Sequence, residues 1–358
     1  MLKRITWVII IGVLMLAAVG CGASQTTDTT GQQEESGAQG DAAPQVNPEP
    51  QGDVTVVYGG SSWLGHYPVM VGIEKGFFSE EGLRVIFQGF YTSSGRMGSM
   101  AAGQLDFAST GSISGLALMA SGNESFYAVG TQDSYATVEG IIAKNDIKAV
   151  EDLRGKKLAV TFSSSAHVLV YDILEQYGLE PGKDVELINL GVNDMVSAFR
   201  SGEIDAAAAW TPAFENLLAL PDAELLVNDE SFSLWQEYEL GPGPDLIVGN
   251  KDFIDNNPEI SKKFLQGYFR SIQFLQSNTD ESAEIIKEYT KLDLEQQKET
   301  LKAITWYGLD KQKEFMVDPG TFISGLEKLS DFLVQHQLID NKPDVRKYVN
   351  TDVLPDSI

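Results

Sequence analysis

The pattern of apolar and polar positions divides the chain from residue 53 onward into short strand-like and helix-like segments that alternate. DVTVVYGG (53–60) and LRVIFQGF (83–90) are rich in β-branched and aromatic residues and contain glycine near their ends, as strands leading into loops commonly do. Between them, PVMVGIEKGFF (68–78) has helical spacing, with Pro68 suited to a first helical position and Gly76 to a helix end. Such alternation predicts a parallel sheet with helices packed on it.

One short pattern occurs twice in the chain. AAGQLDFASTGS (101–112) and SGEIDAAAAWTP (201–212) both run from a small residue through Gly, any residue, Leu or Ile, and Asp into small and apolar residues. Each copy follows a helix-like stretch, so Gly103 and Gly202 are predicted to end helices and a strand to open near each Asp. We expect the copies to mark the same place in two similar units that read strand, loop, helix, strand, helix, strand.

Two further predicted strands flank the second unit, EGIIAKN (139–145) and DLIVGNKDF (245–253), and the pattern after Pro258 is almost wholly helical. The sequence therefore predicts an α/β protein of two lobes, the second inserted in the first, with a hinge of two crossing segments. Lobe one is expected to comprise residues 53–141 and 248–358, with the helical C-terminal region packed on it, and lobe two residues 142–247.

The N-terminal segment has the composition of an export signal. After Lys3 and Arg4, the uncharged apolar run at 5–20 is short for a membrane span, which predicts a signal peptide over 1–20. It stops at Cys21, the only cysteine, and the sequence AVGC resembles a bacterial lipobox with Ala18 where Leu is usual. We expect lipidation at Cys21, a disordered tether over 21–52 that lacks aromatic and basic residues, and an extracytoplasmic, lipid-anchored protein.

The charge balance excludes one class of partner. Asp and Glu number 51 against 26 Lys and Arg, a formal net charge of −25, so the surface repels nucleic acid. An anionic ligand would have to be held by local donors and dipoles. His66, His167 and His336 show no metal-ligand spacing, and no nucleophile elbow or phosphate loop is present. The sequence predicts no catalytic residues, no cofactor and no metal.

Serine-rich loops are the main candidates for a ligand site. Ser61–Ser62, Ser93–Ser94 and Ser163 to Ser165 each follow a predicted strand and precede a helix, where hydroxyls and unpaired backbone N–H groups favour a carboxylate or sulfonate. Alternatively, each serine caps its helix.

Four other residues are candidates with equally plain alternatives. Trp63 and Trp210 could wall a ligand or simply pack, and Asp245 could pair with an ammonium group or serve a turn. Arg96 could pair with an anion, although an arginine on a helix surface is usually solvated.

Several segments together resemble a known family. YPVMVGIEKGFFSEEGLRV, SSGRMGSMAAGQLDFASTGS, EDLRGKKLAV, SGEIDAAAAWTPA and DLIVGNKDFIDNNPEI are similar, in order, to the substrate-binding proteins of ABC importers for nitrate, sulfonate and taurine, and most to the taurine-binding branch. The resemblance implies a type II periplasmic-binding-protein fold in a monomer that closes on a small anionic or zwitterionic ligand and delivers it to a permease with its ATPase. Ala166 stands where the branch usually has Thr.

The expected ligand-binding set combines the loop candidates with the residues that match the taurine-binding branch. It comprises Ser62, Trp63, Ser93, Ser94, Ser112, Ser164, Ser165, His167, Trp210 and Asp245. A small sulfonate, taurine or an alkanesulfonate, is the expected ligand. The alternatives are nitrate, bicarbonate, a pyrimidine thiamine precursor or a flavin in the same fold, or an enzyme that forms the thiamine-precursor pyrimidine with His66 or His167 as reagent. An adhesin or sensor role is the least favoured.

Overall fold

The computed structural model describes residues 54–358 apart from 136, 236–240, 291 and 317–320. The predicted signal segment 1–20, the lipidation residue Cys21 and the tether 21–52 lie outside the described residues. Within the described ranges, no helix combines the length and the apolar character that crossing a bilayer requires.

One five-stranded sheet, sheet one, combines the first unit of the chain with a strand from much later in the sequence. Its order is β2-β1-β3-β11-β4, with β2 parallel to β1, β1 parallel to β3, and β11 antiparallel to both of its neighbours. The strand bounds are Val54–Gly60 (β1), Leu83–Gly89 (β2), Phe107–Gly111 (β3), Phe126–Thr131 (β4) and Asp245–Asn250 (β11). The segment predicted to return from the second unit thus completes the first sheet.

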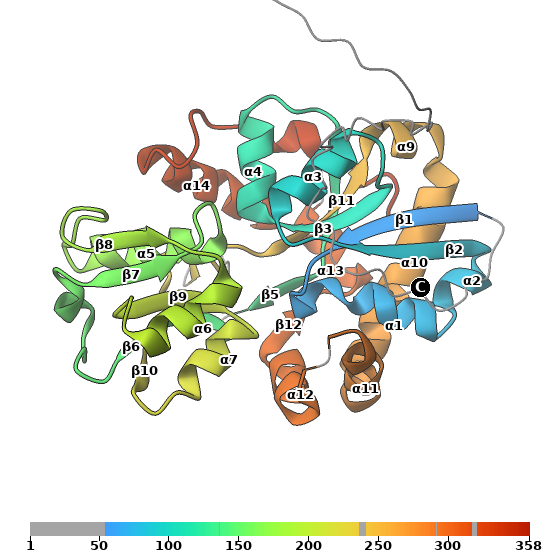
Figure 1. Ribbon diagram of the computed structural model, residues 1–358. Helices are drawn as coiled ribbons and strands as arrows, with labels where there is room; N and C mark the ends of the chain where they lie inside the picture. Colours follow the sequence, from blue (N-terminus) through green and yellow to red (C-terminus); the bar gives the residue numbers. More distant parts are fainter. Residues whose placement is uncertain (1–53, 136, 236–240, 291, 317–320) are drawn as a thin grey trace, which may run out of the picture. The chain divides into compact units, whose positions relative to one another are not determined.

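A second five-stranded sheet, sheet two, repeats this arrangement. Its order is β10-β6-β9-β7-β8, with β7 parallel to β8 and β9, and β6 antiparallel to β9 and β10 (Figure 1). The bounds are Glu139–Lys144 (β6), Lys157–Val160 (β7), Glu186–Asn189 (β8), Ala206–Trp210 (β9) and Ala223–Asn228 (β10). In each sheet, a crossing segment therefore supplies an antiparallel strand, which is β11 beside β3 in sheet one and β6 beside β9 in sheet two.

The repeated sequence pattern has one structural meaning in both sheets. Gly103 and Gly202 follow helices with φ of 71° and 78°, the left-handed region that glycine adopts readily. Three residues later, the Oδ2 atom of Asp106 accepts a hydrogen bond from the Val57 backbone N–H at 2.8 Å, and that of Asp205 accepts from the Lys157 N–H at 2.9 Å. Each aspartate thus ties its strand to the parallel neighbour.

Helices cover the sheets as the alternation predicts. The helices that follow the first strands are Pro68–Glu74 (α1), Phe77–Glu80 (α2), Ser93–Ala101 (α3) and Ser112–Ala120 (α4); those of the second unit are Ser165–Gln176 (α5), Val192–Ser201 (α6) and Ala213–Leu218 (α7). The C-terminal region adds Lys251–Asn256 (α9), Pro258–Ser277 (α10), Thr279–Thr290 (α11), Leu294–Ala303 (α12), Leu309–Met316 (α13) and Thr321–Gln335 (α14).

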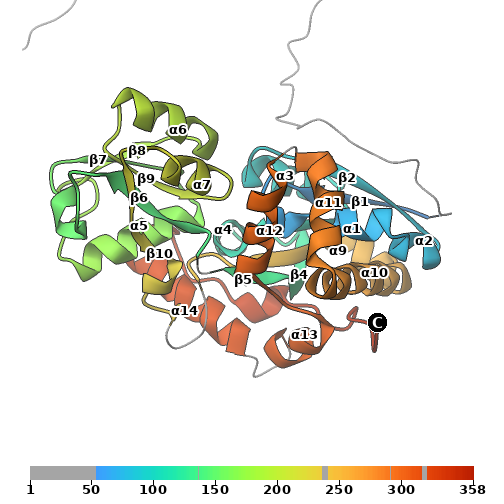
Figure 2. The same cartoon turned by 90° about the horizontal axis from the view of Figure 1, so that it is seen from below.

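The C-terminal helices pack on sheet one and its helices. Phe264 of α10 stacks on Phe107 of β3 with ring centroids 4.2 Å apart and on Phe78 of α2 at 5.4 Å. Figure 2 shows α10 and α11 beside α1. The predicted fold of two α/β lobes with a helical C-terminal region is confirmed, whereas the lobe boundaries at 141/142 and 247/248 stay predictions.

The structure corrects the sequence analysis in a few places. The predicted strand 245–253 ends at Asn250, and its last residues begin helix α9, because the Asn250 side chain accepts a hydrogen bond from the Phe253 N–H and caps the helix. The sequence analysis did not identify α4 or β4. A small sheet of β5 (Asp133–Tyr135) and β12 (Ile304–Trp306) was also not predicted, since its strands pair across a long sequence separation.

Candidate functional site

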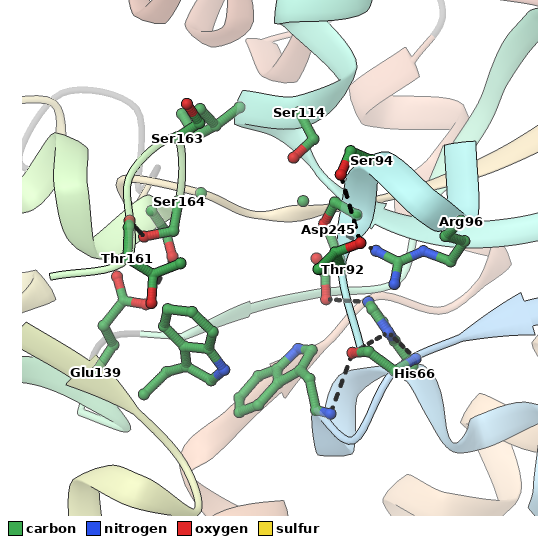
Figure 3. Close-up of a pocket in the computed structure, with 18 of the residues that line it drawn as sticks. His66, Thr92, Ser94, Arg96, Ser114, Glu139, Thr161, Ser163, Ser164 and Asp245 are labelled. Carbon is green, nitrogen blue, oxygen red and sulfur yellow. Dashed lines mark hydrogen bonds and ion pairs between the residues drawn. The ribbon is translucent and has the colours of Figure 1, made fainter. Parts of the chain in front are cut away.

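A cavity of about 340 Å³ is lined by residues from the elements of both sheets. From sheet one and its loops and helices come Ser61, Trp63, His66, Tyr91, Thr92, Ser93, Ser94, Arg96, Gly111, Ile113, Ser114 and Asp245. The opposite part of the lining comprises Tyr135, Glu139, Thr161, Phe162, Ser163, Ser164, Ser165, Trp210 and Gly243. Figure 3 shows Glu139, Thr161 and Ser164 facing Thr92, Ser94 and Asp245 across the open space.

Three helices begin at this cavity. Thr92 caps α3 by accepting a hydrogen bond from the Gly95 N–H, and Ser164 caps α5 by accepting from the His167 N–H at 3.3 Å. The α4 helix begins beside Gly111. The first N–H groups of an α-helix lack partners within the helix and carry its positive dipole end, so the three starts together favour an anion.

Arg96 lies one turn into α3 and faces the cavity (Figure 3). The expectation that it is solvated is wrong, since the side chain is only 2% exposed. Its Nη2 atom donates hydrogen bonds to the Ser93 Oγ at 3.1 Å and the Thr110 Oγ1 at 3.5 Å, and its buried Nε has no partner among the described residues. Burial lowers the pKa of Arg96 to about 10, against the opposing effect of Asp245, so the side chain stays charged at neutral pH.

His66 and Asp245 form a buried pair in the same wall. The His66 Nδ1 atom accepts a hydrogen bond from the Ser61 backbone N–H at 3.0 Å, which places the ring proton on Nε2, 3.3 Å from the Asp245 Oδ2. Desolvation lowers the pKa of His66 although Asp245 opposes the shift. Asp245 therefore has a histidine at ion-pair distance and the positive charge of Arg96 acting on it.

A second carboxyl group, Glu139, lines the opposite part of the cavity. It is fully buried at the start of β6, and its Oε2 atom accepts a hydrogen bond from the Ser165 Oγ at 2.6 Å. Burial raises the pKa of Glu139 to about 7, and burial together with Glu139 raises the pKa of the neighbouring Asp229 well above its ordinary range. At neutral pH this pair therefore holds at least one proton.

Aromatic side chains form the apolar parts of the lining. Trp63 is buried and meets Tyr135 edge-on, with ring centroids 5.1 Å apart, while Trp210 is half-buried at the end of β9. Tyr91 and Phe162 remain 64% and 42% exposed although both line the cavity. The apolar rings flank the polar groups, as in small-molecule pockets generally.

The structure brings seven of the ten predicted ligand residues to this cavity: Trp63, Ser93, Ser94, Ser164, Ser165, Trp210 and Asp245. Three lie outside the lining. Ser62 is exposed, Ser112 is buried beside Gly111 with its Oγ unpartnered among the described residues, and His167 is buried with its Nδ1 accepting from the Ser163 N–H at 3.2 Å. Ligand contact by any of the ten stays a prediction.

Several lining residues were absent from the predicted set. Ser61 lies in a loop that the sequence analysis identified, although Ser62 was chosen there; its hydroxyl bonds the His66 Nδ1 at 2.9 Å. Thr92 precedes a helix with the N-cap signature and could have been found. Nothing in the sequence marked Glu139 as a lining residue, because an acidic residue at the start of a strand is common.

The described residues contain no group of three or more His, Cys, Asp or Glu side chains placed to hold a metal ion. The acidic side chains near the cavity instead lie singly or in pairs. Asp133 is fully buried with both carboxylate oxygens unpartnered among the described residues, and burial and Asp245 raise its pKa well above the ordinary range. The cavity lining itself therefore combines hydrogen-bond donors with two carboxyl groups, those of Asp245 and Glu139.

Comparison with known proteins gives both a family and a fold. The sequence signature of the family described as "NMT1/THI5 like" matches residues 63–282. The taurine-binding periplasmic protein of Escherichia coli strain K12 is 30% identical over 204 residues, which are 57% of this chain and 61% of that protein, so less than two thirds of the relative is matched. A Bacillus subtilis strain 168 protein named for aliphatic-sulfonate binding is 27% identical over 289 residues, 79% of this chain and 82% of the relative.

Among solved structures, the alkanesulfonate-binding protein SsuA from Xanthomonas axonopodis pv. citri, bound to MOPS, is similar with a TM-score of 0.70. The identity is 18%, and the match covers 84% of this chain and 99% of that chain. Similarity at this level of identity establishes the fold, which is the periplasmic-binding-protein fold that the sequence predicts.

Proposed function

The chain belongs to the NMT1/THI5-like family, and from this membership and the cavity we propose that it is the extracytoplasmic solute-binding component of an ABC importer for a small sulfonate. Taurine and alkanesulfonates are the proposed ligands, in keeping with the names of its relatives. The protein would hold the ligand between its two sheets and deliver it to a permease driven by an ATPase.

One observation carries this proposal: three helix starts and a buried arginine surround the same cavity. A sulfonate carries one delocalised charge on three oxygens, and it needs several donors spread around it. The hydroxyls of Ser93, Ser94 and Ser164, the N–H groups of the helix starts and the Arg96 guanidinium are such donors. They hold the anion locally in a chain whose net charge of −25 repels anions at long range.

The two-sided lining explains how binding would couple to delivery. Donors from α3 and α4 belong to the sheet-one side, while those from α5 belong to the sheet-two side. A ligand that contacts both sides favours the conformation in which they approach, and a permease could read that conformation. Trp63 and Trp210 would cover the apolar carbon chain.

The anchoring proposal rests on the sequence. A lipid on Cys21 would hold the protein at the outer face of the membrane, with residues 22–52 as the tether. We propose that the mature protein acts as a monomer.

A ligand panel tests the function. Isothermal titration should detect binding of taurine or ethanesulfonate to the chain from residue 53 onward, with closure recorded by small-angle scattering. Tight binding of nitrate, bicarbonate, a pyrimidine or a flavin, with no response to any sulfonate, would refute the sulfonate assignment while leaving the solute-binding role. No response to any of these ligands would contradict the role itself.

A further inference from the structure

The cavity contains two carboxyl groups with different surroundings. Asp245 has the His66 ring at 3.3 Å and the positive charge of Arg96 acting on it, so one cation of the protein already acts on this carboxyl. Glu139 has no such neighbour: its Oε2 accepts from the neutral Ser165 hydroxyl, and its interaction partners are the acidic groups Asp229 and Asp245. The sequence analysis gave Asp245 as a candidate partner for an ammonium group, and that role stays a prediction. Of the two carboxyl groups, Glu139 is the one on which no cation of the described residues acts.

One oxygen of Glu139 lacks a partner other than another acid. Glu139 lines the cavity and its side chain is fully buried, and its Oε1 atom has no donor among the described residues apart from the proton shared with Asp229. A buried carboxylate oxygen without a partner is costly, and a charged donor is the partner that stabilises it most. Figure 3 shows Glu139 across the open space from Arg96.

We infer that Glu139 binds the cationic group of a zwitterionic ligand whose anionic group lies among Arg96 and the starts of α3 and α4. This assignment rests on the proposed function and narrows it to amino-sulfonates, and more generally to ligands with an ammonium group at one end and an acid at the other. Arg96 on one wall of the cavity and Glu139 on the opposite wall then bind opposite ends of the ligand, so that the ligand connects the two parts of the lining.

The protonation of the Glu139 group gives this inference an independent readout. Asp229, Tyr135 and Asp245 are the titratable groups that act on Glu139, and the proton held by the Glu139 and Asp229 pair would be displaced when an ammonium group binds. A ligand without an ammonium group would leave that proton in place or draw in another.

The test compares taurine with ethanesulfonate, which lacks the amine, on the wild-type chain and on Glu139→Gln. In the variant, taurine affinity should fall about tenfold to a hundredfold, and ethanesulfonate affinity should change by less than about threefold. Asp172→Asn is the matched control, because Asp172 is a buried carboxyl on α5 that lies outside the cavity lining. It should leave both affinities within about threefold.

A second measurement needs no variant. Titrations near pH 7 in two buffers of different ionisation enthalpy should show proton release when taurine binds the wild-type chain and none when ethanesulfonate binds. Binding of both sulfonates with an unchanged taurine preference in Glu139→Gln, or without proton release, would overturn the role of Glu139 and leave the proposed function standing. Failure of the wild-type chain to bind either sulfonate would overturn the proposed function, and the inference with it.

Discussion

The two sheet units are built alike, but they place different chemistry at the cavity. Both have an aspartate that binds the backbone of the neighbouring strand and a serine-rich loop whose N–H donates to a histidine Nδ1. In the first unit this histidine, His66, lies beside Asp245 and lines the cavity. In the second unit, His167 stacks on Phe162, with ring centroids 4.5 Å apart, and lies outside the lining.

This difference shows which properties a repeated fold supplies and which it does not. Helix starts at the carboxyl ends of strands come with the architecture, so both units offer donors to an anion. Charged groups come from single residues, namely Arg96 and Asp245 in one part of the lining and Glu139 in the other. The features that the two units share therefore predict the position of a ligand. The charged residues in which they differ predict the chemical class of that ligand.

The largest expected effect tests whether the charge of the first unit dominates binding. Arg96→Gln should weaken ethanesulfonate binding about a hundredfold, because it removes a buried cation that lines the cavity. Isothermal titration measures the loss. Arg200→Gln, at an exposed arginine of α6, is the control and should bind normally. Comparable affinities in the two variants would mean that the helix starts hold the anion without Arg96.

The next effect concerns the carboxyl group of Glu139, which lies in the part of the lining opposite Arg96. Because the folded-state pKa of Glu139 is raised to about 7, the folded ligand-free protein keeps a proton that the unfolded chain releases above about pH 4.5. The contribution of this proton to the free energy of unfolding is fully present below about pH 4.5 and is lost as the pH rises through about 7. Wild type should therefore lose about 2 kcal/mol more unfolding free energy than Glu139→Gln between pH 5 and pH 8.

Urea unfolding of both chains at the two pH values measures this difference. Asp229 and Asp133 also have raised pKa values and remain in both chains, so the variant should keep part of the pH dependence. Parallel pH profiles for wild type and Glu139→Gln would contradict the assignment of this proton to Glu139.

A smaller effect separates the two histidines. His66→Ala should lower sulfonate affinity about tenfold, since it removes a lining group and leaves Asp245 without its neighbour. His167→Ala should change affinity by less than about threefold and act mainly on stability, measured by thermal unfolding. Equal losses of affinity in the two variants would show that both units use their histidine in the same way.

The smallest effect tests the likeness of the units. Asp106→Ala and Asp205→Ala each remove a hydrogen bond between side chain and strand, and each should lower the unfolding free energy by about 1 kcal/mol. Denaturant titration of both variants provides the comparison. A difference between them well above this value would show that the repeated pattern stabilises only one of the two sheets.

The sequence predicted most of the fold because hydrophobic periodicity is local. Strands β1 and β2, helix α1 and the helix ends near Gly103 and Gly202 were identified from apolar spacing and glycine positions. Helix α4 was missed because the run SISGLALMA is apolar on most sides and offers no helical contrast.

The site was predicted less completely, since burial depends on contacts between distant segments. The serine loops were predicted from their place between a strand and a helix. The contacts of the buried Arg96 instead involve residues of other elements, a hydrogen bond to Thr110 and the charge of Asp245. The surroundings of Glu139 require Asp229, which is far away along the chain. No local pattern could reveal either.

The placement of the crossing strands has a consequence for the order of assembly. Strands β3 and β4 are not hydrogen-bonded to each other, because β11 lies between them, so sheet one stays open until the chain has been made through Asn250. Sheet two is contiguous from Glu139 to Asn228 and can close earlier. In a chain that emerges N-terminus first from a ribosome or a translocation channel, the half that begins second would finish first and could serve as the platform on which the other is completed.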